Sequence, residues 1–207
     1  MEPETYYHIY NHANGNENLF RTSENYYFFL KQRAKYIEPV ADAYAYCLMP
    51  NHFHFLVMTK NEEDLHQKDL QKDLQGFENL GGLGRKEVSK IYQQAFSNLF
   101  NSYSKAFNKT YDRRGSLFMP NFKKKKISSD AYLTAVITYI RRNPIHHGFV
   151  DTLDDWPYSS YYAFISANKT KLKREAVLKW YGDQRDFKSA HHSMQINLPD
   201  KSILIDF

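Results

Sequence analysis

The sequence predicts an α+β fold in which helices pack against an antiparallel sheet. Short segments rich in β-branched and aromatic residues alternate with longer segments whose apolar residues recur at helical spacing. The chain has 207 residues, a length that suits one compact domain with an appendage. Its apolar content of 42% and charged content of 25% can build a core and exclude a wholly disordered polyelectrolyte.

The first half of the chain is predicted to form a strand, a helix and a two-stranded hairpin. Each strand is rich in β-forming residues and ends in turn-forming residues. The helix has apolar residues at helical spacing and is closed by Pro39. In order, these elements span residues 6–11, 23–38, 40–48 and 52–59.

The second half is predicted to form two helices with one strand between them. The first helix is amphipathic over residues 97–110, and residues 123–127 resemble a strand or ribbon edge. The second helix begins at Asp130 and is expected to stop near Arg142, because a residue before proline avoids the helical region. The order β-α-β-β-α-β-α fits an antiparallel sheet with a ferredoxin-like βαββαβ core.

Three regions of different composition organise the chain. We expect a main domain over residues 1–165 and a polar C-terminal extension over residues 166–207, to which the sequence assigns no function. A polar insert over about residues 60–96 interrupts the main domain. It holds a Gln-Lys-Asp-Leu repeat and a glycine cluster, which favour a solvated helix and a flexible loop.

Composition also limits the class of protein. The single cysteine, Cys47, excludes an intramolecular disulfide framework and a cysteine-based zinc finger. No apolar run approaches the roughly 20 residues of a membrane span, and the first residues lack the pattern of a signal peptide. We therefore expect a cytoplasmic protein with no membrane partner. The net charge of +5 and the pI of about 9.0 favour an anionic partner.

Two histidines of the predicted hairpin are candidates for holding a metal. Side chains alternate between the faces of a strand, so His52 and His54 project from the same face. Phe53 and Phe55 then face the core. Two histidines at this spacing are more often structural, and an ion needs a third ligand, which Cys47 is poorly placed to supply.

The last predicted helix carries a candidate nucleophile. Tyr139 lies on its mostly apolar face, and Asn143 lies one turn later, where its amide oxygen is beside the phenol. The alternative is a core tyrosine with a bonded hydroxyl, which periodicity alone favours. A phenol, two imidazoles and an amide oxygen could surround one divalent cation and one phosphate.

Basic and aromatic residues are interleaved around this helix. Aromatic residues make up 16% of the chain, and rings beside cations suit stacking on unpaired bases along a phosphate backbone. A charge run can equally be a solvated face. The candidate DNA-binding residues are Arg113, Arg114, Lys123, Lys124, Lys125, Lys126, Arg141 and Arg142.

Four short motifs follow one another within residues 6–165. They are Pro50-Asn51-His52-Phe53-His54, Arg114-Gly115-Ser116-Leu117-Phe118, the run from Tyr139 to Gly148, and Trp156-Pro157-Tyr158-Ser159-Ser160. In type and order they resemble the single-tyrosine transposases of bacterial insertion sequences, and most closely the REP-associated branch of that family. The long polar insert and the C-terminal extension depart from the family pattern.

The resemblance implies an HUH endonuclease, named for its His-hydrophobic-His pair, that cuts and rejoins single-stranded DNA through a 5′-phosphotyrosine. His52 and His54 match the metal-binding pair, Tyr139 matches the nucleophile, and Asn143 falls where the family places a polar metal ligand. The implied cofactor is Mg²⁺ or Mn²⁺, and the implied partner is single-stranded DNA with a hairpin. The metal would stabilise charge on the scissile phosphate, because a phenol is a poor nucleophile at neutral pH.

Two other functions are compatible with the same residues. A catalytically silent protein could bind single strands or hairpins through the same sheet, rings and basic loop. A metal-dependent hydrolase could use water and would not need Tyr139. The sequence leaves open which DNA is recognised, whether the protein forms a homodimer, and whether the tyrosine acts in its own subunit.

Overall fold

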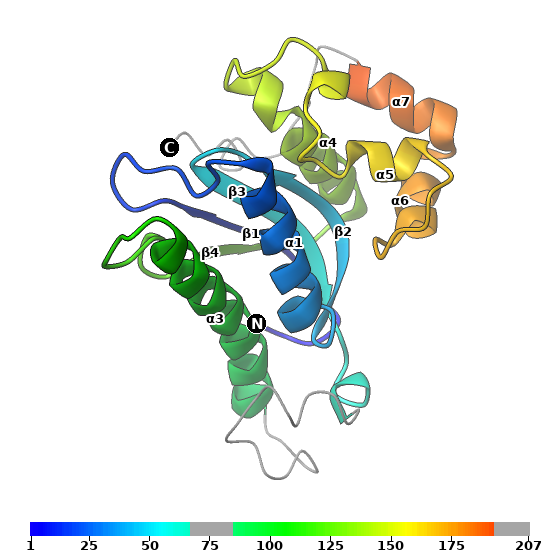
Figure 1. Cartoon of the computed structure of the whole chain (residues 1–207). Helices are drawn as coiled ribbons and strands as arrows, with labels where there is room; N and C mark the ends of the chain where they lie inside the picture. The colour runs from blue at the N-terminus through cyan, green and yellow to red at the C-terminus, as the bar shows by residue number, and fades with distance from the viewer. Residues whose placement is uncertain (67–84, 193–207) are drawn as a thin grey trace.

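The computed structural model describes residues 1–66 and 85–192. Its centre is a four-stranded antiparallel sheet of order β2-β3-β1-β4, with helices on both faces (Figure 1). β3 pairs antiparallel with its neighbours β1 and β2, and β1 pairs antiparallel with its neighbours β3 and β4. The predicted α+β class and βαββαβ order are therefore confirmed. The strands are β1 (Tyr6–His12), β2 (Ala41–Leu48), β3 (His52–Thr59) and β4 (Lys123–Lys126).

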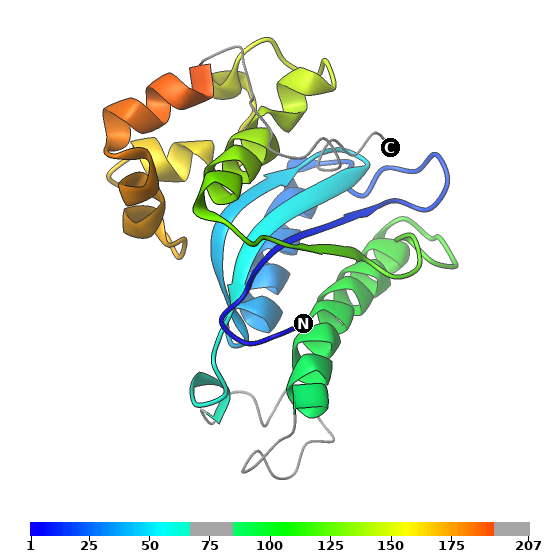
Figure 2. The ribbon, with the colours of Figure 1, turned by 180° about the vertical axis from the view of Figure 1, so that it is seen from behind.

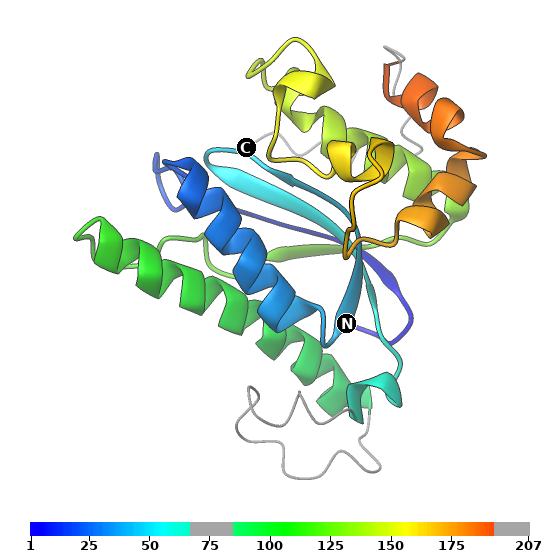
Figure 3. The same cartoon turned by 45° about the vertical axis from the view of Figure 1, so that its right-hand side comes forward.

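One face of the sheet is covered by α1 (Ser23–Ile37) and α3 (Arg85–Thr110) (Figure 3). The core on this side is rich in aromatic rings. For example, Phe29 of α1 lies 5.3 Å from Phe53 of β3, measured between ring centroids. Phe53, Phe55 and Val57 all belong to this core, as the alternation of β3 predicts.

Helix α3 begins earlier than the sequence suggested. The expected polar insert reached to about residue 96, but residues 85–96 form the first turns of α3. Val88, Ile91 and Phe96 are buried there against the sheet, so burial of an apolar stripe rather than local polarity determines this helix. The Gln-Lys-Asp-Leu repeat and the glycine cluster lie outside the described residues.

The opposite face is covered by α4 (Asp130–His146), which lies in front of the sheet in Figure 2. The expected stop at Asn143 and Pro144 is wrong, because the helix continues through both residues. Both Asn143 and Pro144 are buried, and the packing of this last turn outweighs the local cost of proline. Gly148 follows the end of the helix and has a φ of 68°, a conformation that glycine adopts without strain.

The C-terminal part of the chain adds helices beside α4, and the sequence assigned none of those beyond residue 166. Their aromatic and aliphatic side chains join the core between α4 and the sheet. Trp156 ties this region to the sheet, since its indole Nε1 donates to the carbonyl of Leu48 over 3.1 Å. None of the described helices is long and apolar enough to cross a membrane. The elements are α5 (Tyr161–Ile165), α6 (Arg174–Tyr181) and α7 (Gln184–His192), with short 3-10 turns at Asp64–His66 and Leu153–Asp155.

Candidate functional site

The histidine pair lies on the face of the sheet that α4 covers. His52 and His54 are separated by one residue of β3, and their ring centroids are 5.1 Å apart. Phe53, between them, points into the opposite core. The predicted shared face is thus what the structure shows. Both imidazoles are almost fully buried, with exposures of 1% for His52 and 0% for His54.

Helix α4 brings the other two candidate residues to this pair. The Oδ1 atom of Asn143 lies 2.8 Å from Nε2 of His52. One turn earlier, the ring of Tyr139 makes an edge contact with His54 at 5.7 Å between centroids. These four residues come from two elements far apart in sequence, and the packing of α4 on β3 places them together.

Two residues that the sequence did not indicate contact the Nδ1 atoms of His52 and His54. Asn51 precedes β3, and its Oδ1 lies 2.8 Å from Nδ1 of His52. His8 of β1 lies diagonal to His54, with its Nε2 3.0 Å from Nδ1 of His54. Alternation along residues 6–12 was the available signal for His8, because it places that imidazole on the α4 face if β1 pairs with β3.

Burial keeps these imidazoles neutral. Desolvation lowers the pKa of His8 to about 3, with a smaller contribution from the charge of Lys125. Burial likewise lowers the pKa of His52 to about 4, while its contact with Asn143 acts in the opposite direction. The pKa of His54 is well below its ordinary value, because burial dominates and the neighbouring imidazoles add to it. Neutral imidazoles are the form that binds metals.

Acid is expected to destabilise the metal-free protein through these histidines. An unfolded histidine titrates near pH 6.5, whereas His8 and His52 remain neutral down to about pH 3 and about pH 4. Between these values the unfolded state binds more protons. The free energy of unfolding is then greatest above about pH 6.5 and falls as the pH falls, by up to about 1.4 kcal/mol per pH unit for each histidine.

Urea denaturation at pH 7, 6 and 5 would measure this dependence. His8→Gln removes one buried titrating group and is expected to make the profile shallower, while His146→Gln, at an exposed position on the end of α4, is expected to leave it unchanged. An equally steep profile in the His8 variant would contradict the assignment.

The donor atoms of the pair fit a divalent cation. A neutral imidazole carries one N–H, so His52 cannot donate to the amide oxygens of both Asn51 and Asn143. If Asn51 takes that proton, the lone pair of His52 Nε2 faces Oδ1 of Asn143, and the buried Nδ2 of Asn143 makes no hydrogen bond. A cation between the two lone pairs would suit this arrangement, as would a 180° turn of the Asn143 amide that lets Nδ2 donate to Nε2. Two ligand atoms that each lie about 2.1 Å from an ion, at right angles to each other, are about 3.0 Å apart. This is close to the 2.8 Å between Nε2 of His52 and Oδ1 of Asn143.

The donor set also indicates which ions suit the site. Across residues 1–66 and 85–192, no three His, Cys, Asp or Glu side chains form a group that could hold a metal ion. The donors predicted from the sequence at this site are two imidazoles and one amide oxygen. This mixture suits Mn²⁺ better than Mg²⁺, which favours oxygen ligands.

The lysine run of β4 is divided between the two faces of the sheet. Lys125 pairs with His8 in register, and its ammonium group lies 5.6 Å from the ring centroid of Tyr132 on α4. Lys125 is therefore on the face of the histidine pair, and alternation places Lys123 on that face as well.

The other two lysines belong to the α3 face. The ammonium group of Lys124 lies 3.3 Å from Oε1 of Gln93 on α3. Lys126 forms an exposed ion pair with Glu2. The sequence grouped these four lysines as candidate DNA-binding residues, but in the structure they do not form one continuous basic surface.

Arg141 is not placed to bind DNA, and the prediction for this residue is wrong. Its side chain is fully buried, with the guanidinium carbon 4.1 Å from the ring centroid of Phe164 and 4.7 Å from that of Phe187. It donates to Ser160 Oγ and contacts His191. Burial lowers its pKa to about 9. The residue spacing on α4 turns it away from the surface and into the layer of C-terminal helices.

The remaining arginines lie nearer to solvent. Arg142 is half-buried and donates to the carbonyl oxygen of His191 over 2.7 Å. Arg113 is paired with Glu17, so its charge is already compensated. Arg114 is exposed and is the arginine of this set most accessible to a phosphate backbone.

The different positions of two arginines lead to a prediction about DNA affinity. For the single-stranded hairpin DNA that the sequence predicts as partner, Arg114→Met is expected to weaken binding several-fold and to reduce the dependence of log affinity on log salt by about one. Arg141→Met is expected to change affinity by less than about twofold, since its guanidinium is fully buried between Phe164 and Phe187. Fluorescence anisotropy across a salt series would measure both, and a larger loss in the Arg141 variant would contradict this placement.

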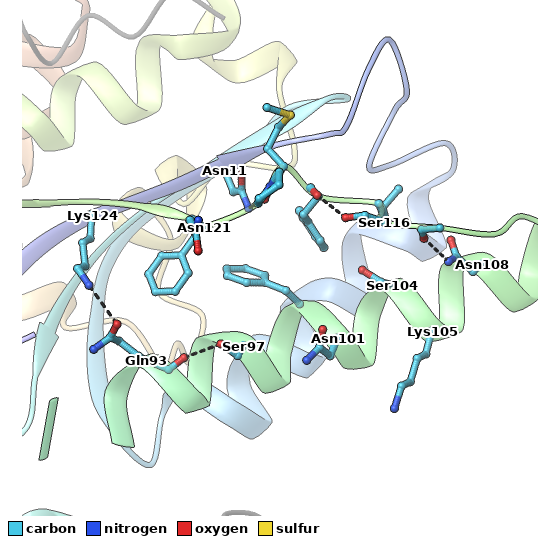
Figure 4. Close-up of a pocket in the computed structure, with 17 residues that line it drawn as sticks. Asn11, Gln93, Ser97, Asn101, Ser104, Lys105, Asn108, Ser116, Asn121 and Lys124 are labelled. Atoms are coloured by element: carbon cyan, nitrogen blue, oxygen red, sulfur yellow. Dashed lines mark hydrogen bonds between the residues drawn. The ribbon is translucent and has the colours of Figure 1, made fainter. Parts of the chain in front are cut away.

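A cavity of about 640 Å³ lies between α3 and residues 115–124. Asn101 and Ser104 line its α3 wall, and Asn121 lies on the facing segment (Figure 4). Lys105 and Lys124 also line it, and none of its lining residues, all within the described part of the chain, is Asp or Glu. Amides and cations without carboxylates give this cavity a chemistry compatible with a nucleotide.

Comparison with known proteins bears on this site. The chain matches no protein-family model. Over 125 residues it is 25% identical to a protein of Haemophilus influenzae that is named as a REP-associated tyrosine transposase. The chain therefore resembles that class of transposase. The match covers 59% of this chain and 60% of the relative, so the chain spans about three fifths of the relative's length.

A solved structure gives a second likeness. The structure of a REP-associated tyrosine transposase bound to a REP hairpin is 16% identical in sequence to this chain, with a TM-score of 0.48. The aligned region covers 81% of this chain and 82% of the other.

Proposed function

We propose that the chain is a transposase-type endonuclease that cleaves and rejoins single-stranded DNA. Tyr139 is the proposed nucleophile, and His52, His54 and Asn143 are the proposed ligands of Mg²⁺ or Mn²⁺. The proposal is supported most directly by one observation. Helix α4 brings Asn143 within 2.8 Å of His52 and places the Tyr139 ring against His54, so a candidate nucleophile lies beside a candidate metal site.

The residues of the chain have distinct parts in the proposed reaction. The hydroxyl oxygen of Tyr139 attacks a DNA phosphorus, and the bond from phosphorus to the 3′ oxygen breaks. The phenol loses its proton and the departing 3′ oxygen gains one, which leaves a 5′-phosphotyrosine and a 3′-hydroxyl. The covalent bond conserves the phosphodiester for rejoining, so no ATP is required. A bound divalent ion would stabilise the charge that develops on the phosphate.

The DNA must gain access to a buried site. Tyr139 is 1% exposed and Asn143 is fully buried in this conformation. Cleavage therefore requires that DNA binding move some of the side chains that cover α4 and β3. A scissile phosphate near the histidine pair would lie on the face that carries Lys125 of the neighbouring strand β4, where the ammonium group favours an anion.

The partner we propose is a single strand that contains a hairpin. The named relative is a REP-associated transposase, and the basic and amide-rich surfaces described above suit an exposed backbone with unpaired bases. A catalytically silent DNA-binding protein is the second candidate. The burial of Tyr139 favours it, because a core phenol has a structural role as well.

A denaturing gel separates these functions. The protein would be incubated with labelled hairpin oligonucleotides carrying single-stranded flanks, with Mn²⁺, Mg²⁺ or chelator. We expect a denaturation-resistant protein–DNA band only when metal is present. Tight binding without this band, across the panel and both metals, would favour the silent binder. Metal-dependent cleavage with turnover and no band would instead indicate hydrolysis by water.

A further inference from the structure

Each histidine of the pair has its Nδ1 atom engaged by a neighbouring side chain. The Nδ1 of His52 lies 2.8 Å from Oδ1 of Asn51, and the Nδ1 of His54 lies 3.0 Å from Nε2 of His8. The two contacts have the same form although the partners differ in chemistry and come from different segments of the chain. Both leave Nε2 as the ring atom that can face a shared ligand.

From this geometry we infer that Asn51 and His8 are positioning residues that fix both histidines as the Nδ1–H tautomer. The amide oxygen of Asn51 can only accept, so its contact with His52 is a hydrogen bond only when the proton of His52 is on Nδ1, and the contact of Nε2 with Oδ1 of Asn143 is then left for a cation. One proton lies between His8 and His54, and it is on His54 when His8 Nε2 accepts. In that state both Nε2 atoms present lone pairs, as a metal ion requires.

The surroundings of His8 support a dedicated role in orienting His54. Its ring stacks on His54 at 5.1 Å and 27°, and its edge meets Tyr139 at 6.1 Å. The side chain is fully buried, and its Nδ1 makes no hydrogen bond. A buried imidazole with only one satisfied nitrogen costs stability, so burial alone does not account for a histidine here.

The inference rests on the proposed metal site, but it can be tested without DNA or catalysis. Nitrogen-15 NMR distinguishes the two tautomers of a histidine by the chemical shifts of Nδ1 and Nε2. In the metal-free protein at pH 7.5 we expect His52 and His54 to carry the proton on Nδ1. A proton on Nε2 of His54 would overturn the assignment to His8, whatever the protein does to DNA.

Two substitutions of His8 test its role as a hydrogen-bond acceptor. His8→Phe keeps a planar ring but removes the acceptor, and we expect His54 to lose its fixed tautomer and Mn²⁺ affinity to fall about 10-fold, as outer-shell changes do. His8→Gln retains an acceptor, and we expect affinity within about threefold of the original. Calorimetric titration with Mn²⁺ would measure both. Unchanged affinity and tautomer in folded His8→Phe would refute the inference.

Substitution of Asn51 provides an independent test on the other histidine. Asn51→Asp keeps the accepting oxygen, whereas Asn51→Ala removes it, so only the alanine variant is expected to release the tautomer of His52. Asn51 is half-buried in the turn between β2 and β3, and the alanine variant is therefore the safer of the two tests for folding. If both Asn51 variants retain the Nδ1–H form of His52, the inference fails for that residue.

Metal binding with the expected tautomers but no covalent DNA adduct would refute the proposed function alone.

Discussion

Tyr139→Phe is expected to abolish the covalent protein–DNA adduct and to reduce cleavage on the order of 10⁴-fold or more, the scale seen when an enzyme loses its nucleophile. The substitution removes one hydroxyl group and keeps the ring. The ring contacts of Tyr139 with His54 and His8 can therefore persist. Affinity for hairpin DNA is expected to change by less than about twofold. Adduct formation by gel and affinity by anisotropy would be measured on the same preparations.

Tyr132→Phe is the matched control for this experiment. Tyr132 lies on the same helix, is 7% exposed and has a hydroxyl that makes no hydrogen bond. The same chemical change is made there without touching the histidine pair, so full adduct formation is expected. Cleavage that survives in Tyr139→Phe would eliminate the phosphotyrosine mechanism. An equal loss in both variants would show that the effect is structural.

His52→Ala is expected to lower Mn²⁺ affinity on the order of 100-fold and to abolish metal-dependent cleavage. This side chain would supply one of three protein ligands, and its loss also leaves Oδ1 of Asn143 without the atom that lies 2.8 Å from it. Titration with Mn²⁺ would measure the affinity, and the denaturing gel would measure adduct formation. Binding of hairpin DNA in chelator is expected to be retained, because that step does not use the metal.

The control for this prediction is His146→Ala. His146 is exposed in the last turn of α4, close in sequence to Asn143, and its substitution removes an imidazole from the same region. We expect Mn²⁺ affinity and adduct formation to be unchanged. Retention of Mn²⁺ affinity in His52→Ala would show that the metal, if bound, is held elsewhere.

The local pattern of the sequence was sufficient to predict most of the sheet. The predicted hairpin and last strand agree with β2, β3 and β4, because their β-forming runs are bounded by turn residues. Strict alternation then placed His52 and His54 on one face and Phe53 on the other. The same local rules failed at Pro144 and at the start of α3, since in both places the burial of side chains outweighs backbone preference.

The basic residues show where a linear pattern cannot predict a surface. Lys124 and Lys125 are adjacent in sequence but lie on opposite faces of the sheet, because a strand alternates its side chains. Arg141 and Arg142 are adjacent on a helix, where each residue turns about 100° from the last. One is therefore buried between Phe164 and Phe187 and the other reaches the surface layer.

The sequence by itself determined the α+β class, the shared face of the histidine pair and the choice of Tyr139 and Asn143 as candidates on one helical face. Only the tertiary structure decided that α4 lies over β3, so that Asn143 meets His52, and that β1 brings His8 to His54. Periodicity specifies which side of an element a residue occupies. Which element covers that side depends on long-range contacts: His8 and His54 are separated by 46 positions in the sequence, and His52 and Asn143 by 91. Local preferences carry no information about such contacts.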